Sequence, residues 1–290
     1  IFEKMIDAVE NDKKEFGSNH RTFIPKKSLL DDQLKSHLDN IYKNQDNQLI
    51  ANKMIEASGL SKNKTYDLRN QKRWSQNDII LITYANSIIN KDEYPLKTLN
   101  KFLRNYFSDT ISGIHILPFY PYSSDDGFSV IDYYKVDTKL GSWKDIQNIG
   151  REFDLMTDLV INHCSSDSAW FKNHLNKSEP GKDYFFEPDK NFDTSHVVRP
   201  RSSDLLSEFT NKDNKISKVW TTFSNDQVDL NFRNPEVLIE ICKLLKFYID
   251  NNIKFFRLDA VAFIWKESGT SCVHLNQTHE IVKLIRLILE

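Results

Sequence analysis

From Asp78 onward the chain alternates between short apolar runs and longer amphipathic segments, and this alternation restricts its fold more than any other feature. The apolar runs cover residues 79–84, 113–117, 155–161 and 254–258, and segments with helical spacing cover residues 96–106, 143–153, 235–249 and 278–290. Short buried strands that alternate with helices build a parallel sheet covered by helices. The sequence therefore predicts an α/β fold.

Two architectures contain such units, an open doubly wound sheet and a (β/α)8 barrel. A nucleotide-binding doubly wound sheet would carry a glycine-rich turn after its first strand. The segment from Ala85 to Ile88, which follows the first run, contains no glycine. We therefore expect a partial (β/α)8 TIM barrel made of strands 1 to 4, over residues 77–163 and 235–290.

Two regions depart from the alternation. Residues 164–234 interrupt it for about 70 residues, too long for a bare loop, so we expect a small inserted subdomain after strand 3. Residues 1–76 are polar and predict a helical N-terminal extension of two or more amphipathic helices, packed beside the barrel, with a free linker as the alternative. The apolar residues at helical spacing there are Leu30, Leu34, Leu38, Ile41, Ile50, Met54 and Ile55.

Composition excludes several classes of partner. The 39 Lys and Arg residues nearly balance 41 Asp and Glu residues, so the chain lacks the positive field that nucleic-acid binding needs. Its apolar runs are far shorter than the roughly 20 residues of a membrane span, and residues 1–4 carry no secretory pattern. Cys164, Cys242 and Cys272 lack the paired spacing of a zinc site. We expect a cytoplasmic protein without nucleic-acid or membrane partners.

A charge pair ends the fourth apolar run. Side chains alternate along a strand, so Arg257 and Asp259 point to the same face. Barrel enzymes place catalytic groups at the carboxyl ends of their strands. A nearby guanidinium lowers the pKa of a carboxyl group, as a nucleophile requires. We therefore predict a lowered pKa and a catalytic role for Asp259, with a structural salt bridge as the alternative.

The third apolar run ends in a second polar set. Asp158 and Asn162 share one face of the predicted strand, and His163 lies at its rim, where the predicted subdomain begins. A histidine there can donate to a sugar hydroxyl, and Asp158 can order its neighbours through hydrogen bonds. The alternative is a capping histidine with a satisfied polar partner.

Two loops add carboxylates, amides and an aromatic ring. Asp125 and Phe128 flank an Asp-Gly turn, a combination suited to the hydroxyls and the apolar face of a sugar. Gln227, Asp229 and Asn231 would share a face if their segment were extended. Taken alone, each segment fits an ordinary polar loop better.

Two arginines lie on a rigid turn inside the predicted subdomain. Arg199 and Arg201 flank Pro200. Paired guanidiniums recognise phosphate or carboxylate groups. A solvated surface pair is the alternative.

Together and in this order, residues 158–163, 227–231 and 256–260 resemble three sequence signatures of glycoside hydrolase family 13, the α-amylase family. Residues 78–290 carry the resemblance. Further segments, residues 81–85, 113–119, 135–137, 140–143 and 266–272, are similar to the sucrose phosphorylase group. Variants at residues 122–128, 220–224 and 265–267 are similar to its glucosylglycerate phosphorylase branch, which also has an N-terminal extension.

The resemblance implies a role for each matching position. Asp259 would be the nucleophile and Arg257 its partner, and Asp125 and His163 would bind glucosyl hydroxyls. The other implied roles are a subsite wall for Phe128, a subsite lining for Gln227, phosphate binding for Arg201 and support for Asp158 and Asn162. No metal or organic cofactor is implied, although amylases often bind calcium near the insert. The implied small-molecule partners are an α-glucoside and inorganic phosphate.

The implied reaction is a retaining double displacement. Asp259 would attack the anomeric carbon of an α-glucoside, and phosphate would then take the glucosyl group as α-glucose 1-phosphate. The family's general acid is a glutamate after a fifth strand, a position that neither Glu267 nor Glu280 occupies. Because the chain begins at Ile1 and stops at Glu290 within a helical pattern, we expect a truncated enzyme, inactive and unstable alone.

Two other functions fit the same residues. A hydrolase or transglucosylase of the family would use the same nucleophile, and its products would distinguish it from a phosphorylase. A non-catalytic binding or scaffold subunit would have no need to keep a charge pair at a strand end.

Overall fold

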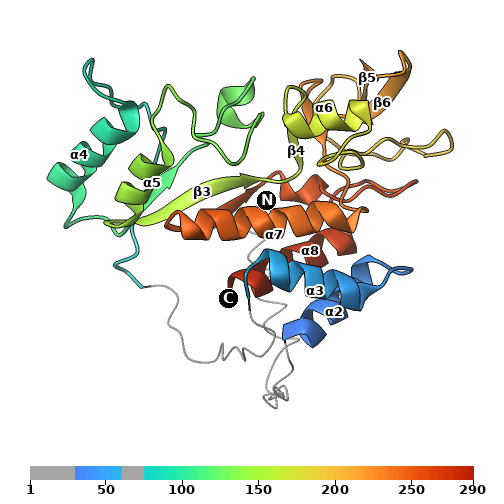
Figure 1. Cartoon of the computed structure of the whole chain (residues 1–290), viewed down its shortest axis with the longest axis horizontal. Helices are drawn as coiled ribbons and strands as arrows, with labels where there is room; N and C mark the ends of the chain where they lie inside the picture. The colour runs from blue at the N-terminus through green and yellow to red at the C-terminus, as the bar shows by residue number, and fades with distance from the viewer. Residues whose placement is uncertain (1–29, 61–74) are drawn as a thin grey trace, which may run out of the picture.

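A four-stranded parallel sheet forms the centre of the computed structural model, which describes residues 30–60 and 75–290 (Figure 1). The strands are β1 (Ile80–Thr83), β2 (Gly113–Ile116), β3 (Asp154–Val160) and β8 (Ile253–Asp259), in the spatial order β1-β2-β3-β8. Each crossover moves one strand further in the same direction, whereas a doubly wound sheet reverses its strand order. The α/β prediction is confirmed, and the strand order is that of a barrel.

Helices connect and cover these strands where the helical spacing predicted them. They are α4 (Pro95–Phe107), α5 (Trp143–Gly150), α7 (Pro235–Asp250) and α8 (Asn276–Leu289). Their apolar stripes are buried, as Leu96, Leu99 and Leu103 show in α4. Helix α7 begins where the side chain of Asn234 accepts a hydrogen bond from the backbone N–H of Glu236, a cap that satisfies one of the free donors of the first turn.

Burial falls from the centre of the sheet to its edges. All of β2 is buried, because strands and helices cover it on every side. Edge strand β1 is only half-buried, and Ile82 is 61% exposed. The carboxyl halves of the other edge strand, β8, and of its neighbour β3 carry polar residues of the candidate site; Arg257 and Asp259 on β8 are partly exposed, whereas Asp158 on β3 is buried.

Residues 163–229 form the inserted part of the fold. It contains β4 (His163–Ser165), α6 (Ala169–Asn176), β5 (Leu206–Thr210), β6 (Ile216–Trp220) and β7 (Gln227–Asp229), and it rises from the carboxyl end of β3 in Figure 1. β4 pairs with β7 in antiparallel register, with His163 opposite Asp229. This pairing returns the chain to the end of β3 after more than sixty residues. Short 3-10 turns, η1 (Asp125–Gly127) and η2 (Val261–Phe263), follow β2 and β8.

Two helices of the N-terminal extension pack under the barrel helices. Helix α2 (Leu30–Ile41) lies against α8, and α3 (Asn47–Ala57) lies against α7 (Figure 1, blue). Their expected apolar residues are buried in the same core as the sheet. The Tyr42 hydroxyl donates to the carbonyl of Phe232 at 2.8 Å. The predicted helices are confirmed here; residues 1–29 and 61–74 of the extension lie outside the described residues, and the domain boundaries stay predictions.

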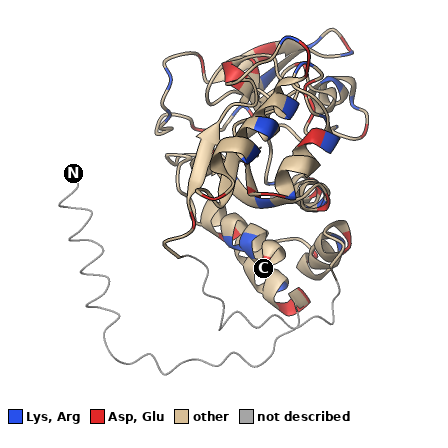
Figure 2. Ribbon diagram, turned by 90° about the vertical axis from the view of Figure 1, so that its left-hand side faces the viewer, with Lys and Arg blue, Asp and Glu red and all other residues tan. Residues whose placement is uncertain are grey.

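Charge is evenly mixed over the fold. In the view of Figure 2, segments with Lys and Arg alternate with segments that carry Asp and Glu. This mixture matches the formal net charge of −2. Among the described residues, every helix is too short or too polar to cross a membrane.

Candidate active site

The charge pair of β8 lies beside β3 and connects three strands. The register places Asp158 opposite Arg257 and Val160 opposite Asp259. Arg257 Nη1 lies 3.0 Å from Asp259 Oδ1 and also donates to Asp158 Oδ1. The side chain of Asp158 is fully buried, and its second oxygen lies 2.8 Å from Nε2 of His115 on β2. Asp158 therefore holds Arg257 in place.

The expected lowering of the Asp259 pKa is wrong. Burial raises the pKa of Asp259 above its ordinary value, although the charge and the hydrogen bond of Arg257 favour the ionised form. Arg257 divides its charge between two carboxylates, and the negative charge of Asp158 raises the Asp259 pKa further. Burial, which alternation along a strand does not reveal, outweighs the guanidinium. The Asp259 side chain is still 18% exposed and therefore accessible.

His163 lies at the start of β4 and is buried. Its Nδ1 atom is 3.2 Å from Nδ2 of Asn162, and its Nε2 atom is 3.1 Å from the carbonyl oxygen of Phe128. Burial lowers the pKa of His163, so the imidazole is neutral near pH 7. A neutral ring offers one donor and one acceptor.

The turn after β2 aims Asp125 at the inserted strand β7. Asp125, Asp126 and Gly127 have positive φ angles of 56°, 49° and 107°, a conformation that Asp tolerates and Gly adopts freely. A side chain at Gly127 would also collide with Pro118, whose Cβ is 2.8 Å from the ideal Cβ position. Asp125 Oδ2 accepts from Gln227 Nε2 at 2.8 Å, and Gln227 Nε2 is 3.1 Å from His163 Nε2.

Aromatic rings link this cluster to the arginines of the insert. The Arg257 guanidinium lies 5.9 Å from the Phe128 ring, and Phe223 contacts His163 at 5.1 Å between ring centroids. Arg201 lies over the other side of the site, 5.9 Å from the Phe223 ring. Arg199 instead donates to the carbonyls of residues 221 and 222 at 3.3 and 3.4 Å. The two arginines therefore differ: Arg199 ties a turn, and Arg201 is exposed next to the site.

Two clefts adjoin the cluster formed by Asp125, Phe128, His163 and Gln227. One, of about 510 Å³, lies at the ends of β1 and β2 and is lined by Tyr84, Tyr122 and Asp126 among others. The other, of about 1190 Å³, includes Arg201 and Phe223. Asp259 lines neither of these clefts. The cluster contacts both, because Asp126 follows Asp125 directly and Phe223 packs on His163.

Sequence reasoning missed three residues that organise the site. His115 holds Asp158, and its signal was a lone polar residue within an apolar run. Asp226 accepts from serine hydroxyls of two segments, residues 123–129 and 165–166, which a serine-rich composition around the site could have suggested. Lys266 forms a buried ion pair with Asp229, with 2.7 Å between Nζ and Oδ2.

Asn231 lies past β7 and caps a turn by accepting from the backbone N–H of Arg233.

Neither glutamate near the end of the chain fits a general acid. Glu267 is exposed and accepts from Gln277. Glu280 lies on α8 and faces the N-terminal helix α2, where burial raises its pKa but hydrogen bonds from Lys283 and His37 lower it to about 2. A general acid needs a raised pKa. Within residues 30–60 and 75–290, His, Cys, Asp and Glu side chains do not gather in threes as a metal site would require.

A parallel sheet in barrel order, with an Arg-Asp pair at the carboxyl end of β8 and an insert after β3, places this chain in the (β/α)8 barrel class of folds. The α-amylase catalytic domain model matches residues 105–283, so the chain belongs to this family. It is 47% identical to the glucosylglycerate phosphorylase of Escherichia coli (strain K12) over 77% of this chain and 40% of the relative. It is 49% identical to that of Spirochaeta thermophila over 73% of this chain and 36% of the relative.

Among solved structures, the sucrose 6F-phosphate phosphorylase from Thermoanaerobacter thermosaccharolyticum is similar, with a TM-score of 0.68 and 32% identity. The match covers 75% of this chain and 47% of that one. The chain thus spans less than half the length of these relatives. The predicted family and the predicted partial barrel are confirmed.

Proposed function

We propose that this chain provides the nucleophile and the glucosyl-binding residues of a retaining α-glucoside phosphorylase. The observation that carries the proposal is the geometry around Asp259. Its carboxylate is partly exposed at the carboxyl end of β8 and is bonded to Arg257. Two of the relatives described above are glucosylglycerate phosphorylases, which supports phosphate rather than water as the acceptor.

In the proposed reaction, Asp259 forms a bond to the anomeric carbon while the bond to the leaving oxygen breaks and a protonated carboxyl group donates its proton to that oxygen. Phosphate then displaces the carboxylate from the β-glucosyl enzyme and yields α-glucose 1-phosphate. The raised pKa of Asp259 does not by itself favour the nucleophilic role, which is proposed from the position of the carboxylate beside Arg257. The raised pKa leaves less of the carboxylate ionised at acidic pH, so the proposed activity falls on that side.

The remaining roles follow from position. Asp125 and His163 would bind glucosyl hydroxyls, Phe128 and Gln227 would line the subsite, and Arg201 would bind phosphate. Asp158 supports Arg257 and Asn162 supports His163 through the contacts given above. Carboxyl groups and phosphate make both bond changes, so the proposal needs no metal or organic cofactor. Within residues 30–60 and 75–290, we assign no residue as the general acid.

The names of the relatives favour glucosylglycerate as the glucoside. The test uses a joined protein, in which this chain is continued by the remaining sequence of the Escherichia coli relative. With glucosylglycerate and phosphate, the joined protein is expected to release α-glucose 1-phosphate. Release of free glucose at the same rate without phosphate would instead identify a hydrolase of the family.

Asp259→Asn in the joined protein is expected to lower kcat by about 10⁴-fold, as removal of a nucleophile does. Asp250→Asn is the matched control, because Asp250 pairs with Lys246 on the surface of α7. The control is expected to keep full activity. Phosphate-dependent release that survives Asp259→Asn would overturn the assignment.

A further inference from the structure

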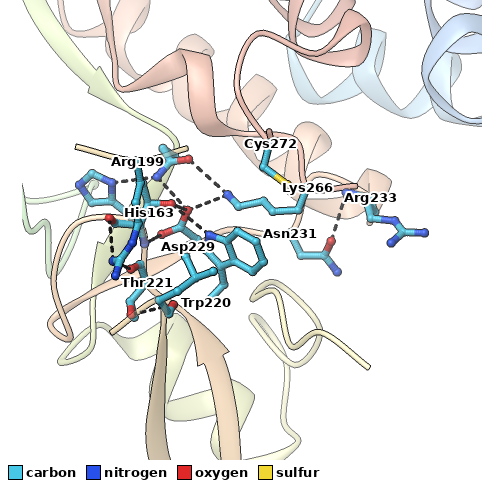
Figure 3. Close-up of polar contacts among 12 residues, drawn as sticks. His163, Arg199, Trp220, Thr221, Asp229, Asn231, Arg233, Lys266 and Cys272 are labelled. Atoms are coloured by element: carbon cyan, nitrogen blue, oxygen red, sulfur yellow. Dashed lines mark hydrogen bonds and ion pairs between the residues drawn. The ribbon is translucent and has the colours of Figure 1, made fainter. Parts of the chain in front are cut away.

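A buried ion pair joins three segments behind His163. Lys266, in the loop after β8, is 2% exposed, and Asp229, on β7, is fully buried. Asp229 also accepts from the backbone N–H of Thr222 at 2.8 Å and from its hydroxyl at 2.6 Å. Figure 3 shows Lys266 reaching toward Asp229 from one side, with His163 on the other. Buried charges are expensive unless they are paired and hydrogen-bonded, so this cluster needs an explanation beyond packing.

The ion pair fixes the orientation of the Asn162 amide. Lys266 can only donate, and its Nζ lies 3.3 Å from Asn162 Oδ1. The Asp229 carboxylate can only accept, and its Oδ2 lies 3.0 Å from Asn162 Nδ2. An amide has one accepting and one donating end. A cation at the oxygen and an anion at the nitrogen therefore both oppose rotation of the Asn162 amide by half a turn.

This orientation matters because the other side of His163 leaves its tautomer undecided. Near Nε2, the carbonyl oxygen of Phe128 requires a ring N–H, whereas Gln227 Nε2, a donor, requires a ring acceptor. Gln227 cannot turn its amide without losing its bonds to Asp125 and to Ser224, whose hydroxyl donates to Gln227 Oε1 at 3.0 Å. The two neighbours of Nε2 thus favour opposite tautomers.

We propose that Lys266 is a positioning residue that sets the tautomer of His163. Because Lys266 and Asp229 turn the Asn162 NH₂ group toward Nδ1, that nitrogen must accept, and the proton lies on Nε2. His163 then carries an Nε2–H donor, which bonds to the carbonyl oxygen of Phe128 in this structure. The tautomer assignment rests on these contacts alone; its consequence for substrate binding rests on the proposed function.

The test reads the tautomer directly, by long-range ¹H–¹⁵N spectra of the joined protein labelled on histidine, with His163→Gln to identify the signals. The unsubstituted protein is expected to show the Nε2–H form. Lys266→Met removes the cation at Asn162 Oδ1 and leaves Asp229 alone to hold the amide, so His163 is expected to populate the Nδ1–H form, with Nε2 accepting from Gln227, and the double variant given below is expected to populate it more fully. An unchanged Nε2–H form in folded Lys266→Met, or an Nδ1–H form without substitution, would overturn the proposal.

Two further variants keep the test decisive. Lys254→Met is the matched control, since Lys254 lies on the same strand as Arg257 and pairs with Asp154 at 2.7 Å. The His163 tautomer should not change in this variant. If Lys266→Met alone does not fold, Lys266→Met with Asp229→Asn removes both charges and leaves no unpaired carboxylate. This double variant is also expected to lose the uniform Nε2–H form, and retention of that form would contradict the role of the ion pair.

Activity separates this inference from the proposed function. If His163 donates to the glucoside, Lys266→Met should raise KM for glucosylglycerate about tenfold, the effect of one lost hydrogen bond, with a smaller change in kcat. A changed tautomer with unchanged KM would support the role of Lys266 and refute substrate binding by His163.

Discussion

Asp226, in the turn before β7, and Asp259, at the carboxyl end of β8, have opposite environments. Asp226 accepts from the serine hydroxyls of Ser123, Ser124, Ser129, Ser165 and Ser166. Burial raises its pKa, but these hydrogen bonds outweigh burial and lower the pKa to about 2. Asp259 bonds to Arg257, and burial raises its pKa. A carboxylate whose lone pairs are all used fastens loops, whereas one with free lone pairs remains available for bond formation.

The largest expected difference is in stability. Asp226→Ala should lower the free energy of unfolding by about 3 kcal/mol, because it leaves several partly buried hydroxyl groups without their charged acceptor. Urea unfolding, followed by circular dichroism, measures this change. Asp213→Ala is the control, since Asp213 is exposed in the turn between β5 and β6. A loss no larger than that of the control would mean that the serines do not fasten these loops.

Asp259→Asn should raise the stability of the protein, whereas Asp226→Ala lowers it. Its ionised carboxylate is disfavoured by burial in the folded state, so the neutral amide is expected to raise the free energy of unfolding by about 0.5 to 2 kcal/mol, the range seen when a strained active site is relieved. The same urea experiment at pH 7 measures this gain in the free energy of unfolding. A clear loss of stability would show that Arg257 stabilises the carboxylate more than burial disfavours it.

The smallest expected effect is on acid stability. The folded pKa of Asp226, about 2, lies below its ordinary value of 3.8, so its contribution is complete above about pH 4 and is lost as the pH falls toward 2. After allowance for solvent screening, this contribution is about 1 kcal/mol. Because Glu280 titrates in the same range, the loss must be compared between the unsubstituted protein and Asp226→Asn. Equal losses in both would contradict the assignment.

The outline of the molecule could be predicted from local patterns. Strands and helices follow from runs of apolar residues such as residues 113–117 and from the spacing of Leu96, Leu99 and Leu103, because burial depends on periods that a sequence displays. The Arg257 and Asp259 pair was also predictable, since alternation along β8 fixes a common face. The order of the polar segments indicated the family, which the comparisons confirm.

Only the tertiary structure decided how these groups behave. The raised pKa of Asp259 depends on burial, and the environment of Asp226 depends on serines from two segments that are far apart from it in the sequence. The buried pair of Lys266 and Asp229 likewise joins residues separated by the whole of α7 and β8. Periodicity determines which face of an element is buried; the pairing of β3 with β8 and of β4 with β7 determines which charges meet, because electrostatic energy depends on distance in space rather than along the chain.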